Sequence, residues 1–236
     1  MNTQAKLYET VAAMMAPGKG ILAADESDAT AGKRLEMVHL PNSAENRQDF
    51  RELLFAAPGI EEYLSGVIMY DSSMRTNTDA GVPFPDVLTA KGIVPGIKVD
   101  LGTKDLDGFP GEVVTQGLDG LEERFLEYYD LGARFAKWRA VVTIDKGLPT
   151  DACLEINAVM LARYAQIAQR CGIVPMVEPE VIFAGDHSIV EAEQVTTRAL
   201  QILFQTLMKY RVDLGGLILK SSMVLAGDLN RDQSTP

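Results

Sequence analysis

Histidine and cysteine are scarce in this sequence, which has only two of each in 236 residues. His39 and His187 are too few for a histidine-rich metal site, and they make a Ser-His-Asp triad hard to build. Cys153 and Cys171 fall inside or at the end of a predicted helix without the spacing of a disulfide framework, which is typical of a reducing compartment. The small number of histidines and cysteines favours metal-free chemistry. We predict that both cysteines are packing residues.

Long apolar runs and an excess of positive charge are also missing. The amino terminus has no apolar export segment and no run of 18 apolar residues occurs, so we expect a cytoplasmic protein that does not enter a membrane. The formal net charge of −11 argues against binding nucleic acid or anionic membranes. It leaves room for a local basic pocket that binds an anionic substrate.

The sequence is 47% hydrophobic and 23% charged, as in ordinary globular proteins, and strand and helix patterns alternate along it. Alternation of this kind predicts a parallel sheet built from βα units. Residues 100–118 form a long glycine-rich segment that we expect to be a loop. The expected strands are 20–24, 64–70, 93–99, 135–142, 173–177 and 217–219, and the expected helices are 3–15, 29–37, 44–57, a short one ending near Ala90, 119–131, 150–171 and 189–210.

The spacing of these units predicts an α/β fold of the (β/α)8 TIM-barrel type with about six of its eight βα units. Eight units at this spacing would need roughly 320 residues. We therefore expect residues 1–236 to form a single incomplete barrel domain that stops two units short, without strands 7 and 8. An unclosed parallel sheet exposes strand edges, so a fragment, a truncated reading frame or a chain that needs a partner is expected.

The segment Gly215–Val224 holds the most informative lysine. Leu217–Leu219 are apolar and are predicted to form a fully buried strand, which places Lys220 at the carboxyl end of that strand. Burial disfavours an ammonium ion, and a neutral amine can attack a carbonyl to form a Schiff base. The alternative is a lysine that reaches solvent, which is the more common fate of a single lysine at a strand end.

Charged residues also follow the other expected strands. Residues i and i+2 of a strand share a face, so Lys137 pairs with Arg139 while Trp138 faces the opposite way with the apolar residues. A barrel places such charges at the carboxyl ends of its strands, where barrel enzymes carry their chemistry. The alternative is a set of rim salt bridges, but grouped buried charges cost several kcal/mol per ion unless each is compensated. The predicted inward set is Asp25, Lys98, Asp100, Lys137, Arg139, Glu178, Glu180 and Lys220.

Five separated segments, in this order, resemble class I fructose-bisphosphate aldolase, and the resemblance covers essentially the whole chain. It implies reversible cleavage of fructose 1,6-bisphosphate to dihydroxyacetone phosphate and glyceraldehyde 3-phosphate through an enzyme-bound imine, with no metal or organic cofactor. The segments are GKGILAADES (18–27), TQGLDGL (115–121), FAKWR (135–139), IVPMVEPE (173–180) and LKSSMV (219–224).

The resemblance also implies catalytic roles by position. Lys220 matches the Schiff-base lysine, and Glu178 matches the general acid and base of imine formation. Asp25 matches the residue that handles the C4 hydroxyl proton during carbon–carbon cleavage. Lys137 matches the cation that stabilises the intermediates, and Glu180 matches a carboxylate that orders the two lysines.

Substrate-binding positions follow from the same resemblance. Lys98 and Arg139 match positions near the distal phosphate, and Ser27, Thr30 and Arg34 match further substrate-binding positions. Thr30 stands where a serine is common and keeps the hydroxyl, while Ser221-Ser222 replace a Pro-Asn pair. Arg47 is a further substrate-binding candidate, although an arginine in the first turn of a helix is more often a solvated surface charge.

Two other functions stay open at this point. One is a non-catalytic binding or assembly module derived from the aldolase barrel, and the other is a different lysine-dependent barrel enzyme, of the transaldolase or pyridoxal-phosphate kind. The five motifs disfavour the second. A phosphorylated sugar is the expected partner, without nucleic acid or membrane, and a homo-oligomer is a possibility because intact family members are commonly tetrameric.

Overall fold

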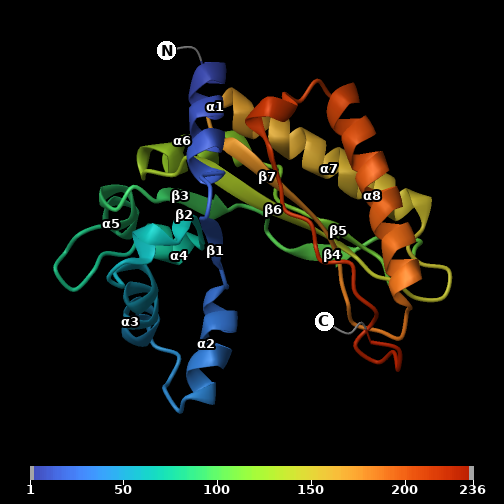
Figure 1. Ribbon diagram of the computed structural model, residues 1–236, viewed down its shortest axis with the longest axis horizontal. Helices are drawn as coiled ribbons and strands as arrows, with labels where there is room; N and C mark the ends of the chain where they lie inside the picture. The colour runs from blue at the N-terminus through green and yellow to red at the C-terminus, as the bar shows by residue number, and fades with distance from the viewer. Residues whose placement is uncertain (1–2, 234–236) are drawn as a thin grey trace. The chain divides into compact units, whose positions relative to one another are not determined.

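The computed structural model describes residues 3–233, which divide into two units (Figure 1). The first unit contains the chain up to Val99 together with Glu122–Lys137 and Arg170–Val174. The second contains Asp100–Leu121, Trp138–Gln169 and the chain from Pro175 onward. Both are α/β structures, and strand β6 contributes residues to each.

The first unit is built on parallel strands in the order β1-β2-β3-β6. The register sets Leu22 beside Val67, Val67 beside Pro95 and Lys98 beside Lys137. The strands are β1 (Gly20–Ala24), β2 (Leu64–Met69), β3 (Val94–Lys98) and the start of β6 (Phe135–Val142). The helices are α1 (Thr3–Met14), α2 (Asp28–Met37), α3 (Ala44–Phe55), α4 (Asp71–Met74), α5 (Phe84–Ala90) and α6 (Leu121–Asp130), with a 3₁₀ turn at Ile60–Glu62.

A glycine in β3 permits the tight packing of this unit. A Cβ atom at Gly96 would overlap the ring of Phe135 on β6, so only hydrogen fits at that position. Phe135 is fully buried, as are Val67, Met69 and Ile97 on the neighbouring strands. The buried apolar side chains, together with the glycine that makes room for Phe135, hold the four strands in register.

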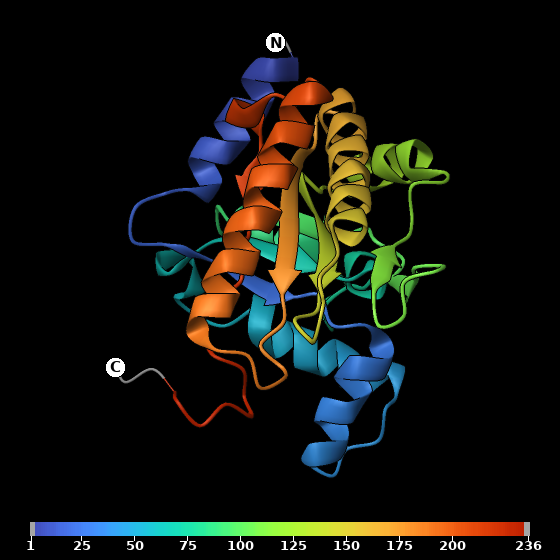
Figure 2. The same ribbon diagram turned by 90° about the vertical axis from the view of Figure 1, so that its right-hand side faces the viewer.

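The second unit continues the parallel pairing with the order β6-β7-β8. Helices α7 and α8 lie beside one another against β6 and β7 (Figure 2). The indole of Trp138 on β6 packs against the ring of Tyr164 on α7, with centroids 5.4 Å apart. The elements are β7 (Val174–Val181), β8 (Ile218–Leu219), α7 (Asp151–Arg170), α8 (Ile189–Lys209), a 3₁₀ turn at Leu214–Gly216, and a hairpin of β4 (Thr103–Asp105) and β5 (Val113–Thr115).

Most of the expected elements are present. The predicted bounds of β1 and β6 are confirmed, and Ser188 and Glu191 form the capping box expected at the start of α8. The hydroxyl of Ser43 caps α3 by accepting a hydrogen bond from the Asn46 amide at 3.1 Å. Among residues 3–233, no helix is both long enough and apolar enough to cross a membrane.

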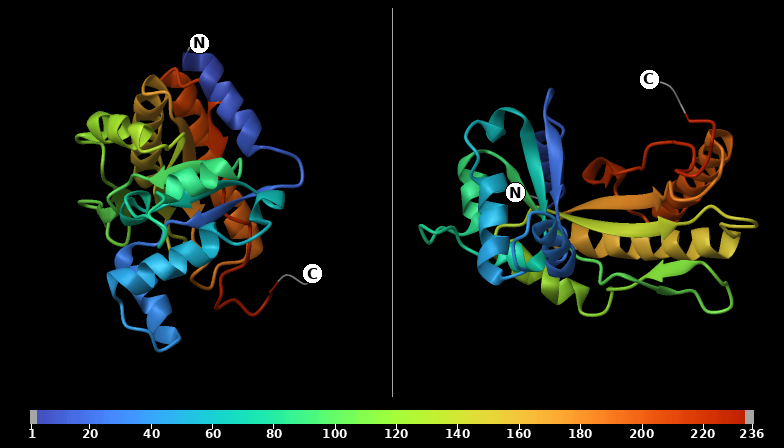
Figure 3. Two further views of the ribbon diagram at one scale, coloured as in Figure 1. Left: turned by 90° about the vertical axis from the view of Figure 1, so that its left-hand side faces the viewer. Right: turned by 90° about the horizontal axis from the view of Figure 1, so that it is seen from below.

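Three local expectations were wrong. The 100–118 loop contains the β4–β5 hairpin (Figure 3). The hairpin is tied to α7, because the Asn157 side-chain amide donates to the Val113 carbonyl at 2.9 Å. Strand β7 runs to Val181, so Glu178 and Glu180 lie within it and not after it. In β8, Leu219 is 36% exposed instead of buried, because β8 is the edge strand of the sheet and has a neighbour on one side only.

Candidate active site

The carboxyl end of β1 brings together two of the predicted catalytic residues. Asp25 directly follows β1, and its carboxylate accepts from the Lys137 ammonium on β6 at 2.7 Å. Both side chains are largely buried, with exposed fractions of 13% and 7%. A buried pair of this kind is stable only as a pair, because removal of one member leaves an uncompensated charge.

Lys98 lies next to this pair. It ends β3 and is the register partner of Lys137, so the two lysines project from adjacent strands on one face of the sheet. Trp138, which follows Lys137 in β6, packs against Tyr164 of α7, as expected for a side chain on the opposite face of the strand. One face at the strand ends is therefore rich in positive charge.

The start of α2 adds hydroxyl groups and a helix N-terminus to the first unit. Ser27 caps α2 by accepting from the Thr30 amide at 3.3 Å, and the hydroxyls of Ser27 and Thr30 lie 3.1 Å apart. Arg34, one turn further along the helix, is 59% exposed and pairs with the Glu26 carboxylate at 2.8 Å. Hydroxyls, an exposed guanidinium and helix amides together suit an anionic ligand.

In the second unit, the Lys220 ammonium is paired with the Glu178 carboxylate. The backbone positions both residues, because the Lys220 amide donates to the Val177 carbonyl at 3.0 Å and so continues the pairing of β8 with β7. Glu178 is buried, whereas the side chain of Lys220 is 38% exposed. The amine is thus held against a buried carboxylate, at the end of a side chain that is partly exposed.

Arg139 and Glu180 form a second ion pair, between β6 and β7. The Asp100 carboxylate is buried and accepts from the backbone amides of Gly102 at 3.2 Å and Arg139 at 3.4 Å. Arg139, inside β6, is therefore fixed by two carboxylates, one bonded to its backbone amide and one to its side chain.

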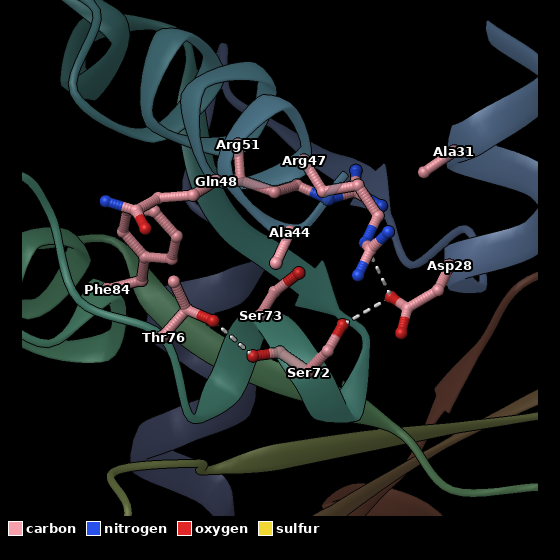
Figure 4. A pocket seen from close by; sticks show the side chains of 10 residues that line it. All are labelled: Asp28, Ala31, Ala44, Arg47, Gln48, Arg51, Ser72, Ser73, Thr76 and Phe84. Atoms are coloured by element: carbon pink, nitrogen blue, oxygen red, sulfur yellow. Dashed lines mark hydrogen bonds and ion pairs between the residues drawn. The ribbon is translucent and has the colours of Figure 1, made fainter. Parts of the chain in front are cut away.

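Arg47 lies elsewhere in the first unit. It lines a pocket of about 120 Å³ between α2, α3, α4 and α5, where its guanidinium bonds to the Asn42 side chain at 2.5 Å and pairs with Asp28 at 3.5 Å (Figure 4). The Ser72 hydroxyl donates to the same Asp28 carboxylate at 2.6 Å. Arg47 is thus neither a freely solvated charge nor bonded to Ser27, Thr30 or Arg34 in the described part of the chain.

Glu26 and Arg51 are not among the site residues predicted from the sequence. Arg51 is 3% exposed, and its guanidinium bonds to both the carboxylate and the main-chain carbonyl of Glu26. The only available signal was the four-residue spacing of Arg47 and Arg51 on α3, which puts them on one helix face. That spacing does not reveal which of the two is buried.

The two cysteines, Cys153 and Cys171, do not form a disulfide bond with each other. Both thiols are free, and burial, followed by the nearby Glu112 carboxylate, raises the pKa of Cys153 to about 11. Burial also raises the pKa of Cys171. Within residues 3–233, no three His, Cys, Asp or Glu side chains lie close enough together to hold a metal ion.

Comparison with known proteins identifies the family of the chain. The family model described as "Fructose-bisphosphate aldolase class-I" matches residues 6–236. A protein of Xanthomonas axonopodis pv. citri named "Probable fructose-bisphosphate aldolase class 1" is 51% identical over 230 residues, covering 98% of this chain and 69% of that protein. A cytoplasmic fructose-bisphosphate aldolase isozyme of Pisum sativum is 48% identical over 223 residues, or 94% of this chain and 62% of that one.

A solved structure is similar over almost all of the chain. It is fructose-bisphosphate aldolase from Plasmodium falciparum in complex with TRAP and a small-molecule inhibitor. The TM-score is 0.97 at 44% sequence identity, and the match covers 99% of this chain and 68% of that one. The α/β aldolase fold class expected from the sequence is confirmed.

Proposed function

The chain belongs to the class-I fructose-bisphosphate aldolase family, and on that premise we propose that it cleaves fructose 1,6-bisphosphate reversibly through an imine on Lys220. Its function is that of a class I aldolase chain, a lyase. The observation that carries the assignment is the pairing of the Lys220 ammonium with the Glu178 carboxylate. A nucleophilic lysine needs a neighbouring group that takes its proton and later returns it.

Imine formation uses the second unit. Glu178 accepts a proton from Lys220, and the neutral amine attacks the C2 carbonyl of the open-chain sugar to give a carbinolamine. Protonated Glu178 then donates to the departing hydroxyl, and water leaves as the imine forms. Glu180 orders the neighbouring charges through Arg139, to which it is bonded. The proton that Glu178 received is returned within the same half-reaction.

Carbon–carbon cleavage uses the Asp25–Lys137 pair. Asp25 removes the proton of the C4 hydroxyl, the C3–C4 bond breaks, and glyceraldehyde 3-phosphate leaves as the electron pair moves into the protonated imine. The remaining enamine is protonated at C3, and water hydrolyses the imine to release dihydroxyacetone phosphate. Lys137 stabilises the charge that develops during these steps.

The anionic groups of the substrate are bound by cationic and hydroxyl-bearing residues. Lys98 and Arg139 contact the distal phosphate, with Ser27, Thr30 and Arg34 as further contacts, and the hydroxyls and the Arg34 guanidinium at α2 suit that role. Arg47 is the weakest member of this set, because it is bonded to both Asn42 and Asp28 and its side chain is 24% exposed, against 59% for Arg34.

Three broader statements complete the proposal. Residues 1–236 belong to a single aldolase domain, the protein acts in the cytoplasm, and the chain forms a homo-oligomer. Relatives from Pisum sativum and Arabidopsis thaliana are named cytoplasmic or cytosolic isozymes, which supports the second statement. Light scattering coupled to size-exclusion chromatography tests the third.

The direct test is imine trapping. The protein is incubated with dihydroxyacetone phosphate, reduced with borohydride and digested, and the adduct is located by mass spectrometry. We expect one reduced adduct on Lys220, its loss in Lys220→Met, and its retention in the control Lys104→Met, which removes an exposed lysine of β4. A folded protein that forms no adduct on Lys220 would instead support a non-catalytic binding module.

A further inference from the structure

Arg51 is an unusual residue for its position, because it carries a permanent charge and is 3% exposed. It lies on α3 and extends towards α2, as does Arg47 (Figure 4). Its guanidinium donates from Nη1 to Oε2 of Glu26 at 2.6 Å and from Nη2 to the main-chain carbonyl of Glu26 at 3.0 Å. One buried side chain thus fixes both the side chain and the backbone of Glu26.

The position of Glu26 gives these two bonds their importance. Glu26 lies between Asp25, the proposed acceptor of the C4 hydroxyl proton, and Ser27, the cap of α2. Lys137 binds the Asp25 carboxylate at 2.7 Å, and Arg51 binds the main-chain carbonyl of the next residue, Glu26. The turn after β1 is therefore tied at two consecutive residues. A two-point bond from a planar guanidinium restricts rotation more than a single contact does.

The Glu26 carboxylate also connects Arg51 with Arg34. Oε2 accepts from Arg51 and Oε1 accepts from Arg34 at 2.8 Å, so one carboxylate joins a buried cation to an exposed one. When Arg34 turns to bind a substrate phosphate, Glu26 keeps a compensating charge because Arg51 stays in place. Without Arg51, Arg34 would be the only charged partner of Glu26 among residues 3–233, and release of Arg34 would leave that carboxylate, 12% exposed, uncompensated.

We propose that Arg51 is a positioning residue of the aldol reaction: through Glu26 it holds Asp25 in place for cleavage and leaves Arg34 free to bind substrate, without touching the substrate itself. This inference rests on the proposed function. It assigns Arg51 to the cleavage step and not to imine formation, because Lys220, Glu178 and Glu180 belong to the other unit.

The test compares two reactions in the same variants. Arg51→Met removes the charge, Arg51→Lys keeps the charge but loses the two-point bond, and Glu26→Gln removes the carboxylate from Arg51 and Arg34. We expect kcat for fructose 1,6-bisphosphate cleavage to fall roughly 10- to 100-fold in Arg51→Met, since small misplacements of a reacting group have effects of that size. Arg51→Lys should give an intermediate value. Borohydride trapping of dihydroxyacetone phosphate on Lys220 should stay within about twofold of wild type.

A double-mutant cycle separates positioning from general destabilisation. If Arg51 acts through Glu26, the Arg51→Met/Glu26→Gln protein should be no slower than the slower single variant, whereas independent effects would multiply. Arg170→Gln is the control, because Arg170 forms an exposed ion pair with Glu122 at 2.5 Å in the same unit. It should leave both reactions unchanged. If Arg51→Met does not fold, Arg51→Lys and Glu26→Gln still test the prediction.

Two results would overturn the inference. One is cleavage at the wild-type rate in folded Arg51→Met or Arg51→Lys, and the other is an equal loss of trapping and cleavage, which a merely structural role predicts. Neither bears on the proposed function, which fails only if the wild-type protein itself forms no imine on Lys220.

Discussion

The Lys137 ammonium lies 2.7 Å from the Asp25 carboxylate although their strands, β6 and β1, are separated in the sheet by β2 and β3. In a flat sheet three strand intervals would hold β1 and β6 about 14 Å apart. The four strands must therefore curl until their outer members face each other, as they do in the wall of a barrel. The curvature brings the two side chains together, and their ion pair in turn stabilises the curved sheet.

Removal of one partner of this pair should therefore lower the free energy of unfolding more than removal of an exposed charge does. We expect Lys137→Met to lower the free energy of unfolding in urea by about 3 kcal/mol, because it leaves the Asp25 carboxylate buried without its cation. Lys137→Met/Asp25→Asn should recover part of that loss. Equal stabilities for Lys137→Met and the exposed control Lys104→Met would contradict the prediction.

Gly96 should resist even the smallest side chain. A Cβ atom there would overlap the ring of Phe135, so we expect Gly96→Ala to lower the free energy of unfolding by about 1–3 kcal/mol. Gly20→Ala on β1 is the matched control, since nothing lies within 4 Å of a Cβ at that position and the expected change is within about 0.5 kcal/mol. Partial rescue of Gly96→Ala by Phe135→Leu, measured by the same denaturation, would identify the ring as the cause.

The thiol of Cys153 should make stability fall in alkaline solution. Its folded-state pKa of about 11 lies above the ordinary value of 9.0, mainly because of burial, so the unfolded chain loses this proton first as the pH rises. The stabilisation is fully present below pH 9 and is lost as the pH rises towards 11. Wild type should therefore lose more stability than Cys153→Ala over this range in pH-dependent denaturation. Parallel curves for the two proteins would rule this out, and the comparison removes the contribution of Tyr128, whose pKa burial raises to about 12.

The capping box of α8 should contribute measurably to stability. The Ser188 hydroxyl accepts a hydrogen bond from the Glu191 amide at 3.2 Å, and the Glu191 carboxylate accepts one from the Ser188 amide at 2.7 Å. We expect Ser188→Ala to cost about 1 kcal/mol in urea denaturation. Thr197→Ala, at an exposed position inside the same helix, provides the comparison and should not destabilise the protein.

The elements that the sequence predicted well are those with strong local signals. Apolar runs between turn residues located β1 and β6, and the Ser188–Glu191 pair located the start of α8, because these signals lie within a few residues of the structure they specify. The predicted site also has a local basis: Lys137 and Arg139 share a face of β6 because alternation along a strand needs no tertiary information.

The elements that were missed depend on distant partners. The β4–β5 hairpin is fixed by bonds such as that from the Thr115 hydroxyl to the Arg139 carbonyl at 2.7 Å. Strand β7 continues through Pro179, a residue that normally argues against a central strand. Arg51 is bonded to Glu26, which lies 25 positions earlier in the chain. No pattern within α3 marks it.

Strand β6 supplies Lys137 to one unit and Arg139 to the other, with a single residue between them. Because side chains alternate along a strand, an insertion or deletion of one residue there would turn every later side chain of the strand to the opposite face. The length of this strand is therefore constrained by both units. A change in length that kept Lys137 on its present face would turn Arg139 to the opposite face, or the reverse. The tripeptide Lys137-Trp138-Arg139 should for this reason be inherited as a block.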